Sequence, residues 1–274
     1  MNKVYQVYQV SDSTGEALDR IFLAIKARFL DFECKTIHYS FTRTENQIDK
    51  IISKCKEEKN VIVLYTIVDK NLSKILSVKC KENNIPSFEI LGNIISDFAK
   101  LLKKEPIRKP GGQHALDEEY YKRIEAVQFT MSHDDGKIIS DLEKSDVVLV
   151  GISRTSKTPT SIYLANRGFK TSNIPLVNEK SVPDFLINNP KSMCVVGLTT
   201  EPERLYDLRR NRMTTINEND KINYVNLEYI KKEVKNALNT FKKYQWPVID
   251  VTRKSVEETA ASVIKIYEIS KKNV

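Results

Sequence analysis

Short apolar runs alternate with helical patterns along most of the chain. Residues 3–10 alternate apolar and polar side chains, as a half-buried strand does. Residues 60–68 form a nearly continuous apolar run, which is typical of a strand buried on both faces of a parallel sheet. Between these runs the spacing of Leu18, Phe22 and Ile25 places them on one stripe of a helix. Repeated strand–helix units predict an α/β fold in which helices cover both faces of parallel sheets.

The alternation is interrupted once, between residues 103 and 117. This stretch holds two prolines, two glycines and four basic residues, a composition typical of a linker or a functional loop. Strand and helix patterns resume after it, with apolar runs at 145–150 and 193–198. We therefore predict two parallel-sheet β-α layers, an N-terminal domain over 1–105 and a linker followed by a C-terminal domain over 106–274.

Two helix starts carry the residue pattern of a capping box. Ser13 and Glu16 have the required spacing at the first helix, and Ser255 and Glu258 have it at the last. In a capping box the hydroxyl and the carboxylate each accept a hydrogen bond from the backbone N–H of the other residue. The pattern predicts that both helices begin directly after the serine.

Composition and charge narrow the class of protein only slightly. The chain is 41% hydrophobic and 29% charged, as an ordinary soluble globular protein is. Its net charge of +8 suits a nucleotide, a nucleic acid or an acidic protein surface, and equally suits lysines on solvated helix faces. The four cysteines are widely separated, so neither a zinc cluster nor a disulfide framework is predicted. Without a leader or a bilayer-length apolar run, we expect a cytoplasmic protein with no membrane contact.

The residues GISRTSKT at 151–158 nearly match the phosphate-binding loop G-x-x-x-x-G-K-[ST]. An apolar run precedes them, and Pro159 stands in the first turn of the helix predicted after them. A buried strand fixes the start of such a loop, and the helix supplies free N–H groups for an anion. The departure is Ser156, which must adopt the backbone conformation of the missing glycine or give the loop a different curvature. We predict that the loop binds phosphate.

The side chains of this loop suit a nucleotide and its metal ion. Lys157 is placed to reach terminal phosphates, Arg154 adds a second cation, and the Thr158 hydroxyl could meet Mg²⁺. The alternative is an ordinary strand-to-helix turn with an exposed lysine. The predicted nucleotide-binding residues are Gly151, Ile152, Ser153, Arg154, Thr155, Ser156, Lys157 and Thr158.

Acidic residues that could assist the loop stand in two places. Asp134 and Asp135, on a sharp turn before Gly136, could hold Mg²⁺ or accept a hydroxyl proton, or could simply end a helix. Asp250, at the end of the last apolar run, is a further candidate. His133 beside Asp134 is a candidate for proton transfer, although a lone loop histidine is more often incidental.

Two basic clusters and one hydroxyl cluster complete the candidates. Four arginines at helical spacing could close over phosphates as a lid, or form a solvated helix face: Arg204, Arg209, Arg210 and Arg212. In the linker, Arg108 and Lys109 precede two glycines and could hold phosphate, or the segment could be a hinge. His114 is another candidate there. The residues SDSTGE at 11–16 crowd hydroxyl groups at a helix start, which fits an anion site or an ordinary helix cap.

Taken together, long stretches of the chain resemble the pyruvate, phosphate dikinase regulatory proteins and the related phosphoenolpyruvate synthase regulatory proteins. The stretches occur in the order of the family and cover nearly the whole chain. They are VSDSTGE at 10–16, KPGGQHALDEEYYKRIEAVQFTMSHDDG at 109–136, GISRTSKTPTSIYLANRG at 151–168, GLTTEPERLYDLRRNRM at 197–213 and WPVIDVTRKSVEETAA at 246–261.

The resemblance implies a bifunctional enzyme with a P-loop kinase-like second domain. Such proteins inactivate the dikinase by phosphorylating a threonine with ADP as the donor, and reactivate it by a phosphate-dependent reaction that releases pyrophosphate. In the family a serine at the position of Ser156 is usual, and the loop binds ADP. Lys157 and Arg154 would then hold the β-phosphate, and the stretch at 11–16 could serve the phosphate-dependent step.

The resemblance leaves the target and the assembly open. The target could be the dikinase or phosphoenolpyruvate synthase, and a homodimer is compatible with either; no nucleic-acid partner is implied. A nucleotide-sensing module that docks on an acidic partner without catalysis is the alternative from a different class. A small-metabolite kinase that consumes ATP ranks third.

Overall fold

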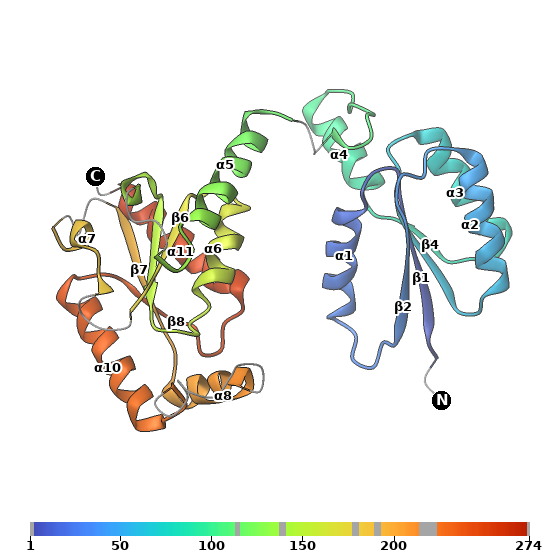
Figure 1. Ribbon diagram of the computed structural model, residues 1–274. Helices are drawn as coiled ribbons and strands as arrows, with labels where there is room; N and C mark the ends of the chain where they lie inside the picture. Colours follow the sequence, from blue (N-terminus) through green and yellow to red (C-terminus); the bar gives the residue numbers. More distant parts are fainter. Residues whose placement is uncertain are drawn as a thin grey trace. The chain divides into compact units, whose positions relative to one another are not determined.

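The computed structural model describes residues 3–112, 116–136, 141–176, 181–188, 193–213 and 224–272, so His114 lies outside the described residues. The chain forms two compact units, 1–115 and 116–274 (Figure 1). Each unit contains a four-stranded parallel sheet flanked by helices, which confirms the predicted α/β class with two β-α layers.

The first unit is a sheet with the strand order β2-β1-β3-β4. Its strands are β1 (Tyr5–Ser11), β2 (Cys34–Tyr39), β3 (Val61–Thr66) and β4 (Ser87–Glu89), and its helices are α1 (Glu16–Lys26), α2 (Glu45–Glu57), α3 (Lys70–Glu82) and α4 (Gly92–Leu102). Val10 and Val63 pack with residues of α2 and α3, whereas Val7 and Leu64 pack with residues of α1. Helix α1 covers one face of the sheet, and α2 and α3 cover the other (Figure 1). Because successive side chains of a strand point to opposite faces, Val7 and Val10 are buried on opposite sides of the sheet, and residues 7–11 are all buried. The prediction of a half-buried strand at 3–10 is therefore wrong for this part of β1, because helices cover both faces of the sheet.

The second unit has the equivalent strand order β6-β5-β7-β8. Its strands are β5 (Val147–Gly151), β6 (Thr171–Pro175), β7 (Cys194–Thr199) and β8 (Val248–Asp250). Its helices are α5 (Glu118–Ser132), α6 (Lys157–Ala165), α7 (Asp184–Asn188), α8 (Pro202–Met213), α10 (Leu227–Lys243) and α11 (Val256–Lys272), with short 3-10 turns η2 (Asp134–Gly136) and η3 (Leu142–Lys144).

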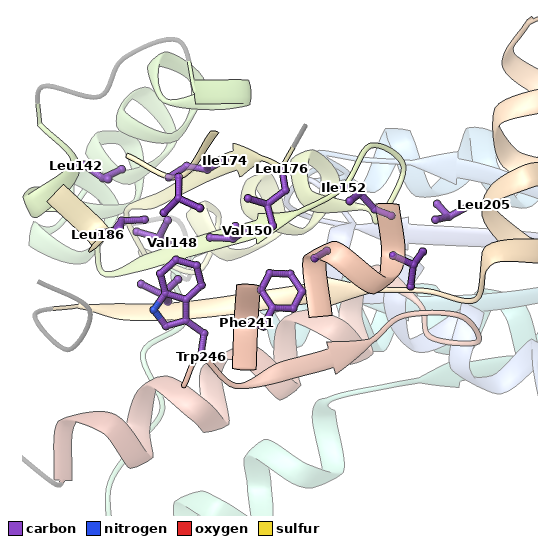
Figure 2. Packing of buried hydrophobic residues seen from close by; sticks show 14 of the residues in the cluster. Leu142, Val148, Val150, Ile152, Ile174, Leu176, Leu186, Leu205, Phe241 and Trp246 are labelled. Carbon is purple, nitrogen blue, oxygen red and sulfur yellow. The ribbon is translucent and has the colours of Figure 1, made fainter. Parts of the chain in front are cut away.

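Strand β5 lies at the centre of the second unit, and all of its residues are buried. Val148 and Val150 belong to a core that contains Phe241 of α10 and Trp246 (Figure 2). Leu149 points to the opposite face, where α6 and α11 supply Leu164 and other apolar residues. Because β5 is buried on both faces, the position of the residue at its carboxyl end is fixed by the core.

The two predicted capping boxes have different outcomes. At α11 the box is confirmed, because the Ser255 N–H donates to Glu258 Oε2 at 2.8 Å and the Glu258 N–H donates to Ser255 Oγ at 3.1 Å. At α1 the prediction is wrong. Gly15 is the N-cap, with φ of 86°, and none of the described side chains caps the helix. The left-handed conformation of Gly15 turns the chain into the helix one residue before Glu16.

Both sheets place their first strand between the second and the third. In each sheet the second strand therefore lies on one side of the first, and the third strand lies on the other side. In open parallel sheets this reversal of strand order creates a crevice at the carboxyl end of the first strand. Ligands of open parallel sheets bind in such crevices. Within the described ranges, no helix is long and apolar enough to cross a membrane.

Candidate functional site

The loop after β5 follows directly from the buried strand and leads into α6. Gly151 ends the strand, and a Cβ atom added to it would lie 2.6 Å from the Leu198 carbonyl oxygen of β7, so a larger residue would push the strands apart. Ser156 is the N-cap of α6 with φ of 57° and ψ of 25°. It thus adopts the left-handed conformation that glycine favours, the first of the two outcomes considered for this position. Arg154 is also left-handed, with φ of 76°.

Lys157 is the first residue of α6 and is buried inside the loop. Its side chain is only 6% exposed, and Nζ donates to the Ile152 carbonyl at 3.1 Å. Burial lowers the pKa of Lys157 to about 8, although the nearby carboxylates of Asp135 and Asp134 act to raise it. A cation that is removed from water in this way gains strongly from an anionic ligand.

Lys157→Met should stabilise the unliganded protein at pH 7, because methionine removes a buried charge. The pKa falls from 10.5 to about 8 on folding, so the unfolded chain binds more protons between these values and wild-type stability rises with pH there. The advantage of the variant is about 3 kcal/mol below pH 8 and shrinks by about 1.4 kcal/mol per pH unit up to pH 10.5. Urea denaturation at several pH values measures it.

The exposed residue Lys265 provides the matched control for this measurement. Lys265→Met should leave the pH dependence of stability unchanged. A difference between wild type and Lys157→Met that stays constant from pH 7 to pH 10 would contradict the buried, lowered-pKa state of Lys157. The Ile152 carbonyl keeps a donor in the variant, because Thr155 Oγ1 also donates to it at 2.9 Å.

The acidic turn η2 lies against the start of α6. Thr158 Oγ1 donates to Asp134 Oδ1 at 2.9 Å, and Asn173 Nδ2 of β6 donates to the same oxygen. The Asn173 Oδ1 in turn accepts from the Asp135 N–H at 2.9 Å. Asp135 is exposed and has φ of 54°. The turn therefore ends α5, as one alternative proposed, and also brings two carboxylates to the loop, as the other did.

His133 lies on the buried side of the same turn. It is 4% exposed, its ring stacks on Phe129 at 3.8 Å, and Nδ1 lies 2.8 Å from the Phe129 carbonyl oxygen. Its backbone carbonyl accepts from the Asn173 N–H at 3.3 Å. Among the described residues, Nε2 has no hydrogen-bond partner. The contacts of His133 thus fix the position of the turn η2 relative to α5 and β6.

One of the four arginines on α8 reaches the loop. Arg209 is 1% exposed and donates to the Ser153 carbonyl at 3.4 Å, whereas Arg204, Arg210 and Arg212 are exposed. Arg209 also forms an ion pair with Glu233 of α10, at 2.7 Å between Nη1 and Oε2. The arginine pattern therefore contains one residue packed beneath the loop and three on a solvent-facing surface.

The linker and the hydroxyl-rich turn meet in the first unit. They line a cavity of about 230 Å³ at the carboxyl end of β1, with Ser13 and Lys109 among its walls. Gly111, with φ of 73°, lies so close that an added Cβ would be 3.3 Å from Ser13 Oγ. Arg108 donates from Nη1 to the Val68 carbonyl at 3.1 Å. The linker residues up to Gly112 thus pack on the first unit.

Oxygen ligands for a metal ion are present beside Thr158. The described residues contain no group of three or more His, Cys, Asp or Glu side chains that could hold a metal ion by themselves. Mg²⁺ needs only one or two carboxylates when substrate phosphates and water complete its shell, and Asp134 with the Thr158 hydroxyl fits that donor set. Asp250 instead accepts hydrogen bonds from the Thr252 hydroxyl and from the Thr252 N–H, the latter at 2.9 Å, and these two bonds lower its pKa.

Two residues of the site carry no local pattern in the sequence. Asn173 lies in the middle of β6, whose sequence TSNIP marks no site, and Tyr224 stands just before α10. The Tyr224 hydroxyl lies 3.3 Å from Ser153 Oγ although 71 residues separate them. A partial signal existed for Arg209, since it stands one helical turn after the fully buried Leu205.

A family model and curated relatives both match this chain over nearly its whole length. Residues 7–264 match the model of a family described as "Kinase/pyrophosphorylase". A relative in Pelagibacter ubique (strain HTCC1062), named "Putative pyruvate, phosphate dikinase regulatory protein", is 60% identical over 273 residues, which are 100% of both chains. A protein of the same name in Sphingopyxis alaskensis is 44% identical over 96% of both chains. A solved LacI-type regulator from Bacteroides fragilis has 11% identity and a TM-score of 0.24 over 97% of this chain and 90% of its own, too low to support an argument.

Proposed function

Because this chain belongs to the kinase/pyrophosphorylase family, a phosphotransferase class, we propose that it regulates pyruvate, phosphate dikinase in both directions. In one direction the β-phosphoryl group of ADP passes to a threonine hydroxyl of the dikinase, which gives phosphothreonine, AMP and a proton. In the other, inorganic phosphate takes the phosphoryl group from phosphothreonine, which restores the hydroxyl and releases pyrophosphate. The names of the relatives support the dikinase as the target.

The buried cation in the loop is the observation that carries this proposal. Lys157 is nearly inaccessible to solvent and is held by the Ile152 carbonyl at the N-terminus of α6. A lysine in this position costs stability unless an anion binds beside it. Phosphoryl transfer depends on positioning and on neutralising charge at the phosphate oxygens, which this arrangement supplies.

We assign the remaining residues of the loop to the nucleotide and its metal ion. Arg154, which has a left-handed backbone conformation, and Lys157 both bind the β-phosphate of ADP. The backbone N–H groups of residues 151–158 bind phosphate oxygens. The Thr158 hydroxyl and Asp134 would hold Mg²⁺, which neutralises phosphate charge when bound.

Asp135 is our candidate for the group that removes the threonine proton. Asp134 already accepts two hydrogen bonds, from Thr158 and Asn173. The described residues donate no hydrogen bond to the Asp135 carboxylate, although its charge acts on Lys157. This carboxylate is exposed to an incoming hydroxyl. In the reverse direction the same carboxyl group returns a proton to the threonine oxygen. We assign His133 to support of the turn.

Incubation with purified dikinase and β-labelled ADP tests the function. We expect label on a threonine of the dikinase and unlabelled AMP in equal amount, and release of labelled pyrophosphate when inorganic phosphate is then added. Phosphoenolpyruvate synthase serves as the parallel target, and ATP as the parallel donor. Transfer to the synthase alone would show that the synthase, and not the dikinase, is the target. A preference for ATP would contradict the ADP assignment.

Binding without turnover would contradict the enzymatic proposal as a whole. If the protein binds ADP stoichiometrically and transfers no label to either target, it is a nucleotide-sensing module that docks on an acidic partner. Its net charge of +8 would then favour association. The labelling experiment and a parallel ADP titration therefore separate the two classes of function.

A further inference from the structure

Two residues outside the phosphate loop contact its residues Ser153 and Arg154. The Tyr224 hydroxyl accepts from Arg154 Nε at 3.4 Å and lies 3.3 Å from Ser153 Oγ. The Arg209 guanidinium lies 4.6 Å from the centre of the Tyr224 ring and donates to the Ser153 carbonyl. We propose that Tyr224 and Arg209 form a clip that positions Arg154 for the β-phosphate and so makes the loop select a nucleoside diphosphate over a monophosphate. This inference rests on the proposed function of the loop.

Arg154 needs such a support because its backbone is strained. A φ of 76° is unfavourable for a residue with a side chain, and conformations of this kind persist only where their surroundings fix them. Tyr224 fixes the Arg154 side chain, and Arg209 fixes the carbonyl of the preceding residue, Ser153. The two contacts therefore act on the two sides of the strained position.

Arg209 is itself held from two helices. It projects from α8, pairs with Glu233 of α10 at 2.7 Å, and donates to the Tyr224 carbonyl at 3.3 Å. A buried ion pair contributes little net stability, because desolvation offsets the attraction of the charges. The pair does fix the orientation of the guanidinium. In this orientation one face of the guanidinium contacts the Tyr224 ring, and one N–H donates to the loop.

The chemistry of the Tyr224 hydroxyl suits an acceptor for a cation. Burial acts to raise the pKa of Tyr224, but hydrogen bonds with Ser153 and Arg154 and the positive charges of Arg154 and Arg209 lower it overall. A hydrogen bond from a charged guanidinium to this oxygen is stronger than one from a neutral donor. Because AMP has no β-phosphate to meet Arg154, the clip should affect ADP binding and leave AMP binding unchanged.

Calorimetric titration of ADP and AMP into the full-length protein tests the clip. Tyr224→Phe removes the hydroxyl and keeps the ring over Arg209, and we expect it to weaken ADP binding by about 5- to 10-fold. AMP binding should stay within about twofold of the wild type. Arg209→Lys, which keeps the charge and loses the fork, should act in the same direction. The matched controls are Tyr229→Phe and Arg210→Lys, both at exposed positions.

Amide hydrogen exchange in the nucleotide-free protein gives a second measurement that does not depend on the ligand. Exchange at residues 152–156 should be faster in Tyr224→Phe and in Arg209→Lys than in wild type, and unchanged in the two controls. Equal weakening of ADP and AMP, or unchanged exchange in both clip variants, overturns the clip. A wild-type protein that binds neither nucleotide instead overturns the proposed function, while the exchange rates still decide whether the clip exists.

Discussion

Replacing Lys157 with methionine is expected to lower the rate of phosphoryl transfer from ADP by at least about 10³-fold. The side chain is buried at the first residue of α6, where it cannot be replaced by solvent or by a mobile neighbour. Methionine has a similar length and no charge, so the loss reports on charge neutralisation at the phosphate and not on a cavity. Initial rates of label transfer from ADP to the dikinase measure it.

The stability of the same variant distinguishes this cause from misfolding. We expect Lys157→Met to be inactive and yet more stable than wild type at pH 7, because the buried cation is removed. An inactive variant with lowered stability would point to damage of the loop. Activity within about tenfold of wild type would remove Lys157 from the mechanism, whereas Lys265→Met should retain full activity as the exposed control.

The fold class could be predicted because buried parallel strands must be apolar on both faces. Every residue of β5 is buried, and its sequence is correspondingly an uninterrupted apolar run. The start of α1 could not be predicted in the same way. A Ser-x-x-Glu spacing fits a capping box at Ser13 and at Ser255, but the φ of 86° at Gly15 sets the start of α1. Backbone conformation at one glycine overrides the side-chain pattern there.

In the candidate site, too, the features that are local in the sequence could be predicted, and the contacts between distant segments could not. The loop at 151–158 is contiguous, so its place between a strand and a helix is visible in the sequence. Contacts made by Asn173 and Tyr224 join segments that are far apart, and no periodicity marks them. Among the four arginines of α8, the spacing from Leu205 hints at Arg209, but its burial and its ion pair with Glu233 of α10 are visible only in the structure.

Replacing Asp135 with asparagine is expected to lower kcat by about 10²- to 10⁴-fold, the usual contribution of a general base. ADP affinity should not fall, because the change removes a negative charge near the loop. The fold should be kept, since the backbone N–H bond of Asp135 to Asn173 does not involve the carboxylate. Thermal stability at pH 7 should fall only slightly, because the exposed carboxylate offsets part of the buried Lys157 charge. Single-turnover rates with saturating ADP separate the chemical step from binding.

Asp134→Asn is the informative comparison, because Asp134 anchors Thr158 and Asn173. Its loss should weaken ADP binding and lower kcat together, whereas the loss of Asp135 should lower kcat alone. The same order should hold for pyrophosphate release, because the group that accepts the threonine proton in one direction must return it in the other. Glu268→Gln, at an exposed position on α11, should change neither reaction. If Asp135→Asn keeps kcat within about threefold of wild type, the proton is accepted elsewhere and Asp135 serves only to end α5.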